Sequence, residues 1–571
     1  MNRLNKIKAL VLVFACFHFV ACESFLDIDE STGNDKETVY RYFTSMNALT
    51  GHLYSGLNSD FGNISGALRE SATDNALYTD PKGQVYDIYN DLWSPSNRID
   101  DVWKKYYGYI RSANSFLENF DISRVERYKY DPDYKDKLLP AALMYPNEVR
   151  ILRAYYYFEL IKRYGDVPLL TRTYEIEEVN TLKKSTFHEV VKYIVDECDQ
   201  VAPLLPISHQ VVTVDPNGFL GETGRVTRGT AMAIKARVLL YAASKLHNPT
   251  NDKEKWKLAA KASLDLIQSG WYSLQGEDAD PLFTKYDNGV LTSKQLIFER
   301  RNTPQATFEQ NNLPYNLEGI SSGGKNVPSQ NLVDIYEMSD GTPFDWGNAA
   351  HKDQPYFDAT GKKIRDPRLY RNVKVNGVLF NYNKQKINLN TVENGAHYTS
   401  ILGMINSGYY MNRYIDPNVN LVAGRVDKYG HHYALYRYAE VLLNYAEAAY
   451  EVFGSVNGTD AELTLSAYDA IAQVRDAAGM PMPALLDMDY IRDERRRELA
   501  FEDHRFWDLR RWKMGEKVKE IYGVRITQEG GNTIYTRVKL QDRVWNDKMY
   551  FYPFSLNENA INPNLTQNPG W

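Results

Sequence analysis

The segment at positions 147–164, NEVRILRAYYYFELIKRY, decides the fold class of this chain. Its apolar and aromatic side chains, among them Ile151, Leu152, Tyr155 and Phe158, recur at the spacing of an α-helix. The segment is followed at positions 165–168 by GDVP, and a glycine followed by a proline is a common C-terminal signal of helices. The sequence therefore predicts a packed helix over 147–164.

The same pattern recurs toward both ends of the chain. Further helices are expected at 228–246, 254–268, 433–453, 463–478 and 489–512. The alanines of 228–246 allow neighbouring helices to approach closely. Paired helices of this texture resemble tetratricopeptide units, which stack because one unit cannot bury its own face. No clean repeat of about 34 residues is visible, so the prediction depends on helix pairing alone.

The stretch between these helical parts has a different texture. Positions 271–432 hold 14 of the 35 glycines, and turn dipeptides such as Asp340-Gly341 and Asn376-Gly377 interrupt it. We expect short strands and long loops here, where binding groups usually lie. The predicted fold is mainly α, with tetratricopeptide-like helix pairs forming a superhelical scaffold, and with an irregular loop-rich region that contains short strands.

Composition narrows the class of protein. Hydrophobic residues make up 43% and charged residues 25% of the 571 positions, which excludes a disordered chain and a multi-span membrane protein. The 67 basic and 73 acidic residues give a net charge of −6, which disfavours a general nucleic-acid binder. Tyrosine accounts for 43 of the aromatic residues, and most of these rings are expected in the packing seams of helices.

The amino terminus has the order of a secretory signal. Arg3, Lys6 and Lys8 precede an apolar run at 9–21 that is shorter than the roughly 20 residues needed to span a bilayer. The run ends in FVAC (19–22), which resembles a bacterial lipobox and predicts an acylated Cys22. Cys16 would leave with the signal, so Cys198 would have no partner for an intrachain disulfide.

Cys198 itself is expected to be inert. Thr186 and Glu189 form a capping box, and the helix that follows places Cys198 on its apolar stripe.

Signatures of catalysis and of metal binding are missing from the sequence. There is no phosphate loop, no zinc helix, no nucleophile elbow and no C-x-x-C pair. The adjacent His431 and His432 are expected on opposite sides of a strand, and Glu498, Glu502 and His504 do not have the spacing of a di-iron site. We therefore expect no catalytic residue, no metal ligand and no cofactor.

The charged run IRDERRREL (491–499) could suggest a nucleic-acid patch, but its acids argue otherwise. Asp493 and Glu494 are placed to pair with Arg497 on a helix surface, so a salt-bridged structural helix is expected.

Motifs across nearly the whole chain resemble the SusD/RagB family of outer-membrane nutrient-binding lipoproteins. The motifs are CESFLD (22–27), RAYYYFEL (153–160), RYGDVPL (163–169), RVTRGTA (225–231), RYAEVLLNYAEA (437–448), ERRRELAFEDHRFWDLRRW (494–512) and NPNLTQNPGW (562–571). Asp503 stands where the family often has glycine, a departure that concerns a helix bend.

The resemblance implies a non-catalytic lipoprotein on the outer membrane, facing the cell exterior. It implies capture of a glycan and delivery to a SusC-like TonB-dependent transporter. Residues 1–21 would be the signal peptide and 22–571 a single domain, with the scaffold at about 35–270 and 433–515 and ligand-binding insertions at about 60–100 and 271–432. A peptide-binding RagB-like protein is the alternative, and a glycoside hydrolase or an assembly scaffold are weaker ones.

A sugar site needs exposed aromatic planes beside groups that hold hydroxyls. Family members commonly place ligand aromatics near 74–98 and in the later loops. We therefore expect platforms at Trp93 and Trp346 and secondary contacts at Tyr78 and Tyr315. The expected hydroxyl partners are Asp74, Asn97 and Arg98. Trp507 and Trp512 are expected to be packing residues instead.

Overall fold

The computed structural model describes residues 40, 42–59, 63–209, 224–276, 286–287, 290–291, 293–320, 323–398, 406–416, 419–422, 426, 428 and 430–571. The predicted signal, Cys22 and the tether after it lie outside these residues. Within the described part, no helix has the length and apolar character needed to cross a membrane.

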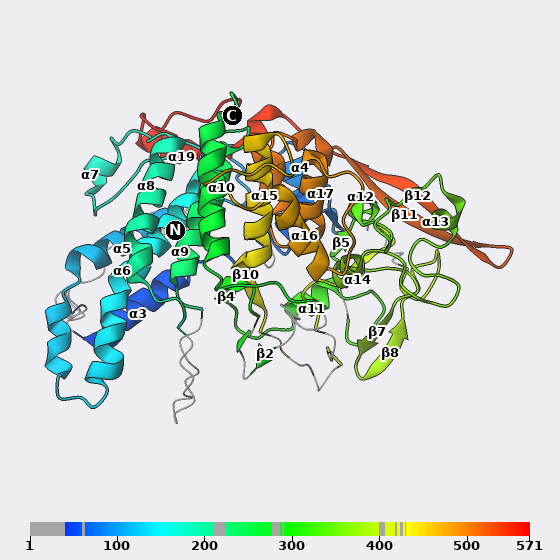
Figure 1. The fold of residues 1–571 in the computed structure, drawn as a ribbon, viewed down its shortest axis with the longest axis horizontal. Helices are drawn as coiled ribbons and strands as arrows, with labels where there is room; N and C mark the ends of the chain where they lie inside the picture. The colour runs from blue at the N-terminus through cyan, green and yellow to red at the C-terminus, as the bar shows by residue number, and fades with distance from the viewer. Residues whose placement is uncertain are drawn as a thin grey trace, which may run out of the picture.

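Helices dominate the fold, as predicted, and pack in the order of the sequence (Figure 1). The long helices are α5 (Trp103–Asn119), α6 (Leu139–Tyr164), α8 (Phe187–Val201), α9 (Arg228–Ala243), α10 (Lys253–Gln268), α15 (Tyr438–Phe453), α16 (Ala467–Ala477) and α17 (Met488–Glu498). Each packs against the next in this series, and α15 also contacts α17. Because α10 is followed in space by α15, the loop-rich segment between them in sequence is an insertion into a continuous helical scaffold.

The predicted helix signals are present in the structure. Thr186 accepts a hydrogen bond from the backbone N–H of Glu189 at 3.3 Å, and the Glu189 carboxylate accepts one from the backbone N–H of Thr186 at 2.7 Å, which together cap α8. Gly165 ends α6 at a positive φ of 69°. Cys198 is buried in α8, as its place on the apolar stripe predicts, and burial raises the pKa of its thiol.

Three predicted helix boundaries are wrong. Helix α6 begins at Leu139 and continues through Pro146. Residues 433–437 belong to strand β10 (His432–Arg437), which is buried on both faces and therefore lacks the alternation that marks a half-exposed strand. The helix expected at 489–512 is two helices, α17 and α18 (Arg505–Arg511), separated by a bend in which Phe501 and Asp503 have positive φ values of 65° and 60°.

The loop-rich half contains short antiparallel strand pairs. They are β1 (Ala76–Tyr78) with β5 (Asn326–Pro328), β2 (Tyr286–Asp287) with β3 (Val290–Leu291), β4 (Leu296–Arg301) with β10, β6 (Val373–Lys374) with β9 (Tyr410–Met411), β7 (Leu379–Tyr382) with β8 (Gln385–Asn388), and β11 (Glu520–Glu529) with β12 (Asn532–Asp542). Short helices connect them: α11 (Thr307–Asn312), α12 (Gln330–Ile335), α13 (Ala349–Asp353) and α14 (Pro367–Asn372). The β11–β12 hairpin extends from the body beside α12 and α13 (Figure 1).

The remaining helices are α3 (Phe43–Tyr54), α4 (Val85–Tyr89), α7 (Ile176–Val179) and α19 (Leu556–Ile561). One large core joins the helices to the loop-rich half, and Tyr155, Tyr156 and Tyr157 are buried in it. These rings confirm the expected use of tyrosine in helix packing.

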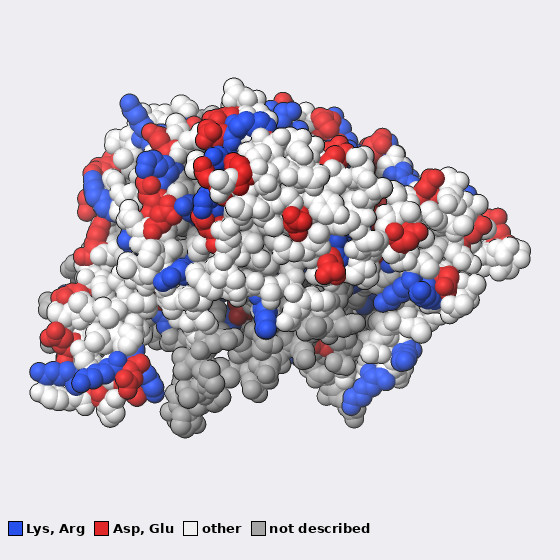
Figure 2. Space-filling view, viewed as in Figure 1, with Lys and Arg blue, Asp and Glu red and all other residues white. Residues whose placement is uncertain are grey.

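The face shown in Figure 2 carries charges of both signs. Lys and Arg are interspersed with Asp and Glu over the helices, and the described part of this face has no continuous basic stripe. A nucleic-acid interface of the usual kind needs such a stripe.

Candidate ligand-binding site

Trp93 is a core residue. Its side chain is 1% exposed, and its ring meets those of Tyr552 and Trp571 edge to face, with centroids 5.0 and 4.9 Å away. Trp571 is the last residue of the chain, so Trp93 holds the C-terminal tail against the body. Since a ligand platform must present a ring face, the expectation at Trp93 is corrected to packing.

Asp74 and Tyr78 are also buried, at 3% and 4% exposed. Asp74 accepts two hydrogen bonds of 2.8 Å from Arg505, and Arg496 lies 3.1 Å away. Burial alone would raise the pKa of Asp74, but the two guanidinium groups lower it to about 2. These side chains have no surface for a sugar, because the segment at 68–79 passes through the core, although its sequence is aperiodic.

Asn97 and Arg98 lie at the surface of the same segment. The Asn97 amide donates to Asp87 at 3.1 Å and to the Leu92 carbonyl at 3.0 Å, and Arg98 forms an ion pair with Asp101. These contacts fix the loop, and a ligand role for either residue stays a prediction. Tyr315 is half-buried and packs against a small apolar cluster around Leu77, so its ligand role also stays a prediction.

Trp346 is less buried than Trp93, and its role as a sugar platform stays a prediction. It is half-buried, its indole N–H donates to Asp334 at 2.9 Å, and the ring of Phe344 meets it edge to face at 5.2 Å. The second oxygen of Asp334 accepts from Arg537 at 3.1 Å, and the Arg537 guanidinium lies 3.5 Å from the centre of the Tyr522 ring. We call Asp334, Phe344, Trp346, Tyr522 and Arg537 the Trp346 face.

Three parts of the chain form this face, namely α12, the loop before α13 and the β11–β12 hairpin. Asp334 is on α12, Phe344 and Trp346 are in the loop before α13, and Tyr522 and Arg537 are on β11 and β12. Trp93 and Trp346 have different neighbours, so the structure does not unite the two predicted platforms. The contribution of the hairpin was missed, although Gly530-Gly531 between two alternating stretches is a hairpin signal.

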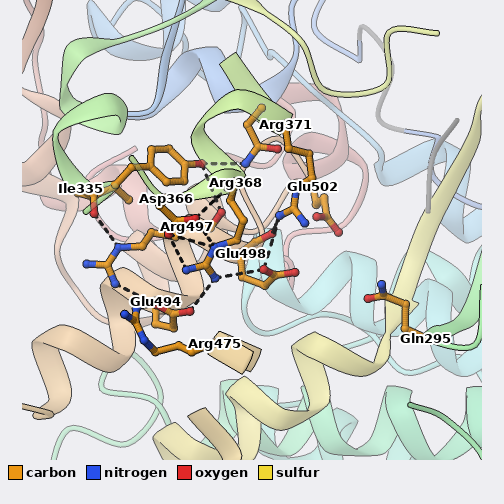
Figure 3. A network of polar contacts seen from close by, with 12 residues as sticks. Gln295, Ile335, Asp366, Arg368, Arg371, Arg475, Glu494, Arg497, Glu498 and Glu502 are labelled. Carbon is orange, nitrogen blue, oxygen red and sulfur yellow. Dashed lines mark hydrogen bonds and ion pairs between the residues drawn. The ribbon is translucent and has the colours of Figure 1, made fainter. Parts of the chain in front are cut away.

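The charged run at 491–499 is structural, and its pairs at Glu494 and Glu498 are buried rather than on the surface (Figure 3). Glu494 accepts from Arg497 at 3.0 Å, as predicted, and also from Arg368 at 2.6 Å and Arg475 at 3.1 Å. Burial raises the pKa of Glu494, but these guanidinium groups lower it to about 2. The run joins the scaffold to α14 in the loop-rich half.

The histidines and acids considered as metal ligands have other partners. His431 lies 2.7 Å from Glu309, and His432 lies 2.8 Å from Glu299. Among the described residues, no group of three or more His, Cys, Asp or Glu side chains is placed to hold a metal ion.

A helical scaffold that carries a loop-rich half with an aromatic face is the architecture of a binding protein. The family model described as "SusD family" matches residues 289–571, and the one described as "Starch-binding associating with outer membrane" matches residues 24–239. The chain belongs to the SusD/RagB family, and the family assigns a binding protein without catalysis.

Relatives cover nearly the whole chain. A SusD-like protein from Formosa agariphila is 22% identical over 99% of this chain and 98% of its own length. The structure of a SusD-like protein from Bacteroides fragilis is 27% identical, covers 94% of this chain and 99% of its own, and has a TM-score of 0.74. A SusD-like carbohydrate-binding protein from the same organism is 24% identical, with 93% and 100% coverage and a TM-score of 0.70.

Proposed function

We propose that this protein captures a glycan at the cell surface and delivers it to a SusC-like TonB-dependent transporter, without catalysing a reaction. The observation that carries the proposal is the Trp346 face. A half-buried indole supplies an apolar plane for the C–H face of a sugar ring, and Asp334 and Arg537 supply an acceptor and donors for hydroxyl groups. The names of the relatives, which include a carbohydrate-binding protein, support the same class of ligand.

The transporter and the membrane anchor are parts of this proposal that depend on the family. The description "associating with outer membrane" supports the location, and the lipobox supports attachment through Cys22. The partner can be tested by purifying the tagged protein from membranes in mild detergent. We expect a large outer-membrane barrel to co-purify, and a protein that always extracts alone would contradict the partnership.

One experiment separates binding from its alternatives. Purified protein is titrated with oligosaccharide and peptide panels in a calorimeter, and each mixture is then analysed for products. Heat with oligosaccharides and no product is the expected result. Product formation would favour a hydrolase, heat with peptides alone a RagB-like peptide binder, and no heat in either panel an assembly scaffold.

The Trp346 face is tested by comparing Trp346→Ala with Trp93→Ala. Trp346→Ala should abolish glycan binding and lower stability by about 1 kcal/mol, since one hydrogen bond and part of the ring's burial are lost. Trp93→Ala removes a core indole and should lower stability by about 3–5 kcal/mol. Glycan affinity and thermal unfolding of both variants check this, and intact binding by Trp346→Ala would place the site elsewhere.

A further inference from the structure

A cavity with a volume of about 950 Å³ lies in the loop-rich half and opens to the surface at exposed residues such as Lys363 and Leu379. Its walls come from α14, strands β6 and β7, the loop at 412–416 and the C-terminal end of α16. Apolar surfaces of Tyr370, Val378 and Phe380 line part of it. The volume is that of a small-molecule site, which is typically about 300–1,000 Å³.

The charges that line this cavity do not balance. The cations are Lys363, Arg365, Arg371, Lys374, Arg413 and Arg437. The carboxylates are Asp416, Asp476 and Glu498. Glu502 pairs with Arg413 and Arg437 from behind the wall, so the described residues give six cations against four carboxylates.

The buried ion pairs between α14 and α17, which lie next to the cavity, do not offset this excess among the described residues. There, the described residues include three cations, Arg368, Arg475 and Arg497, and three carboxylates, Asp366, Glu494 and Glu337. Within the part of the chain that the structure describes, the excess of positive charge therefore lies at the cavity.

Lys374 is the buried lysine of this lining. It is 5% exposed, its ammonium donates to the side-chain oxygen of Asn412, and it lies 4.7 Å from the centre of the Phe380 ring. Among the described residues, Lys374 has no carboxylate partner, whereas the neighbouring Arg371 pairs with Glu498 at 3.5 Å. Burial lowers the pKa of Lys374 to about 7, because its ammonium is taken out of water with no carboxylate beside it among the described residues.

We propose that this cavity binds a small anion, the carboxylate or sulfate group of an acidic sugar or a free inorganic anion, and that Lys374 is the cation that pairs with it. An anion beside Lys374 would reduce the excess of positive charge at the cavity, and a hydrogen bond to a charged group is stronger where the local dielectric is low. The apolar wall at Phe380 and Val378 would meet the ring that carries the group. This site is separate from the Trp346 face and does not depend on glycan binding there.

The test uses wild-type protein, Lys374→Met and Lys386→Met, which removes an exposed lysine from β8 outside the cavity wall. Thermal unfolding and calorimetry are run with glucuronate, inorganic sulfate, inorganic phosphate and neutral glucose at constant ionic strength. For the wild type and Lys386→Met, we expect saturable binding of at least one anion and none of glucose. Lys374→Met should bind that anion at least tenfold more weakly.

Each outcome bears on the proposal. Glucuronate binding identifies the group as a sugar carboxylate, and binding of only sulfate or phosphate identifies a tetrahedral oxyanion, either free or as the sulfate group of an acidic sugar. Anion binding that is unchanged in Lys374→Met, or no saturable binding by the wild type, would overturn the site. If Lys374→Met unfolds too early to be measured, Lys374→Gln and Lys374→Arg replace it, and only the arginine variant should bind the anion. Trp346→Ala should keep the anion response, so failure of the glycan proposal remains distinguishable.

Discussion

At the scale of single residues, Glu70 is a buried carboxyl group whose charge is poorly compensated. It is 2% exposed, and one of its oxygens accepts from the Asn75 amide and from the backbone N–H of Phe501 at 3.2 Å. Burial, together with the charge of Asp503, raises the pKa of Glu70 to about 7. The folded protein therefore holds a proton on Glu70 between about pH 4.5 and pH 7, where the unfolded chain has lost it.

Glu70→Gln should change how stability depends on pH. Since the folded state binds more protons than the unfolded state between pH 4.5 and pH 7, Glu70 lowers the free energy of unfolding as the pH rises through that window. The free energy of unfolding of the glutamine variant, relative to that of the wild type, should therefore rise by up to about 3 kcal/mol between pH 5 and pH 8. Denaturant unfolding at both pH values measures this gain. A constant difference between the two proteins would contradict the raised pKa.

Single residues also show where the sequence is insufficient. Trp93 and Trp346 both lie in aperiodic segments rich in polar residues, yet one is in the core and the other is half-buried. Periodicity predicts burial only in regular elements, and a loop that crosses the core has none. The sequence around Asp74 gives no sign of its burial, because its cationic neighbours Arg496 and Arg505 are more than 400 positions away. It therefore predicts a hydroxyl partner where the structure has a buried ion pair.

At the scale of elements, the contact between α14 and α17 depends on buried ion pairs. Arg368 is fully buried and donates to Asp366, Glu494 and Glu498 at 2.8, 2.6 and 3.2 Å. Arg368→Met should lower the free energy of unfolding by about 3–5 kcal/mol, because it leaves carboxylates buried without this partner.

The matched control for Arg368→Met is Arg525→Met. Arg525 pairs with Glu393 at 2.9 Å on the surface, with 58% of its side chain exposed, so its loss should cost less than about 1 kcal/mol. Denaturant unfolding of both variants gives the comparison. Equal effects would show that the network stabilises the α14–α17 contact no more than a surface pair does.

Elements with local signals were predictable from the sequence, and those fixed by distant partners were not. The capping box of α8 and the glycine after α6 lie within a few residues of the helix ends that they mark. Strand β10 is defined by its pairing with β4, more than 130 residues earlier, and its apolar run also suits a helix. The bend after α17 needs Asp503 at positive φ, where the side chain pairs with Arg69, another distant residue.

At the scale of the whole molecule, the C-terminal segment packs against elements from the first third of the chain. The C-terminal Trp571 packs on Trp93, and the Asn568 amide donates to the carbonyls of Tyr164 and Tyr552 at 2.9 and 2.8 Å. The β11–β12 hairpin, late in the sequence, completes the Trp346 face on the loop-rich half. The C-terminal part of the chain therefore contacts both the helical scaffold and the loop-rich half.

The proposed lipid anchor at Cys22 attaches the folded domain to the membrane through the segment that follows it in sequence. Cys22 precedes the first described helix by about 20 residues, and the intervening sequence begins with the acidic segment ESFLDIDE (23–30). One acyl chain holds a protein only marginally, but several chains at roughly 0.8 kcal/mol per buried CH₂ group make attachment effectively permanent. Cys22→Ala should therefore move the protein from the membrane fraction to the soluble fraction while glycan affinity stays unchanged. Fractionation by centrifugation, with Cys198→Ala as the control that keeps the lipobox, checks this. If Cys22→Ala still sediments with membranes, a different attachment holds the protein there.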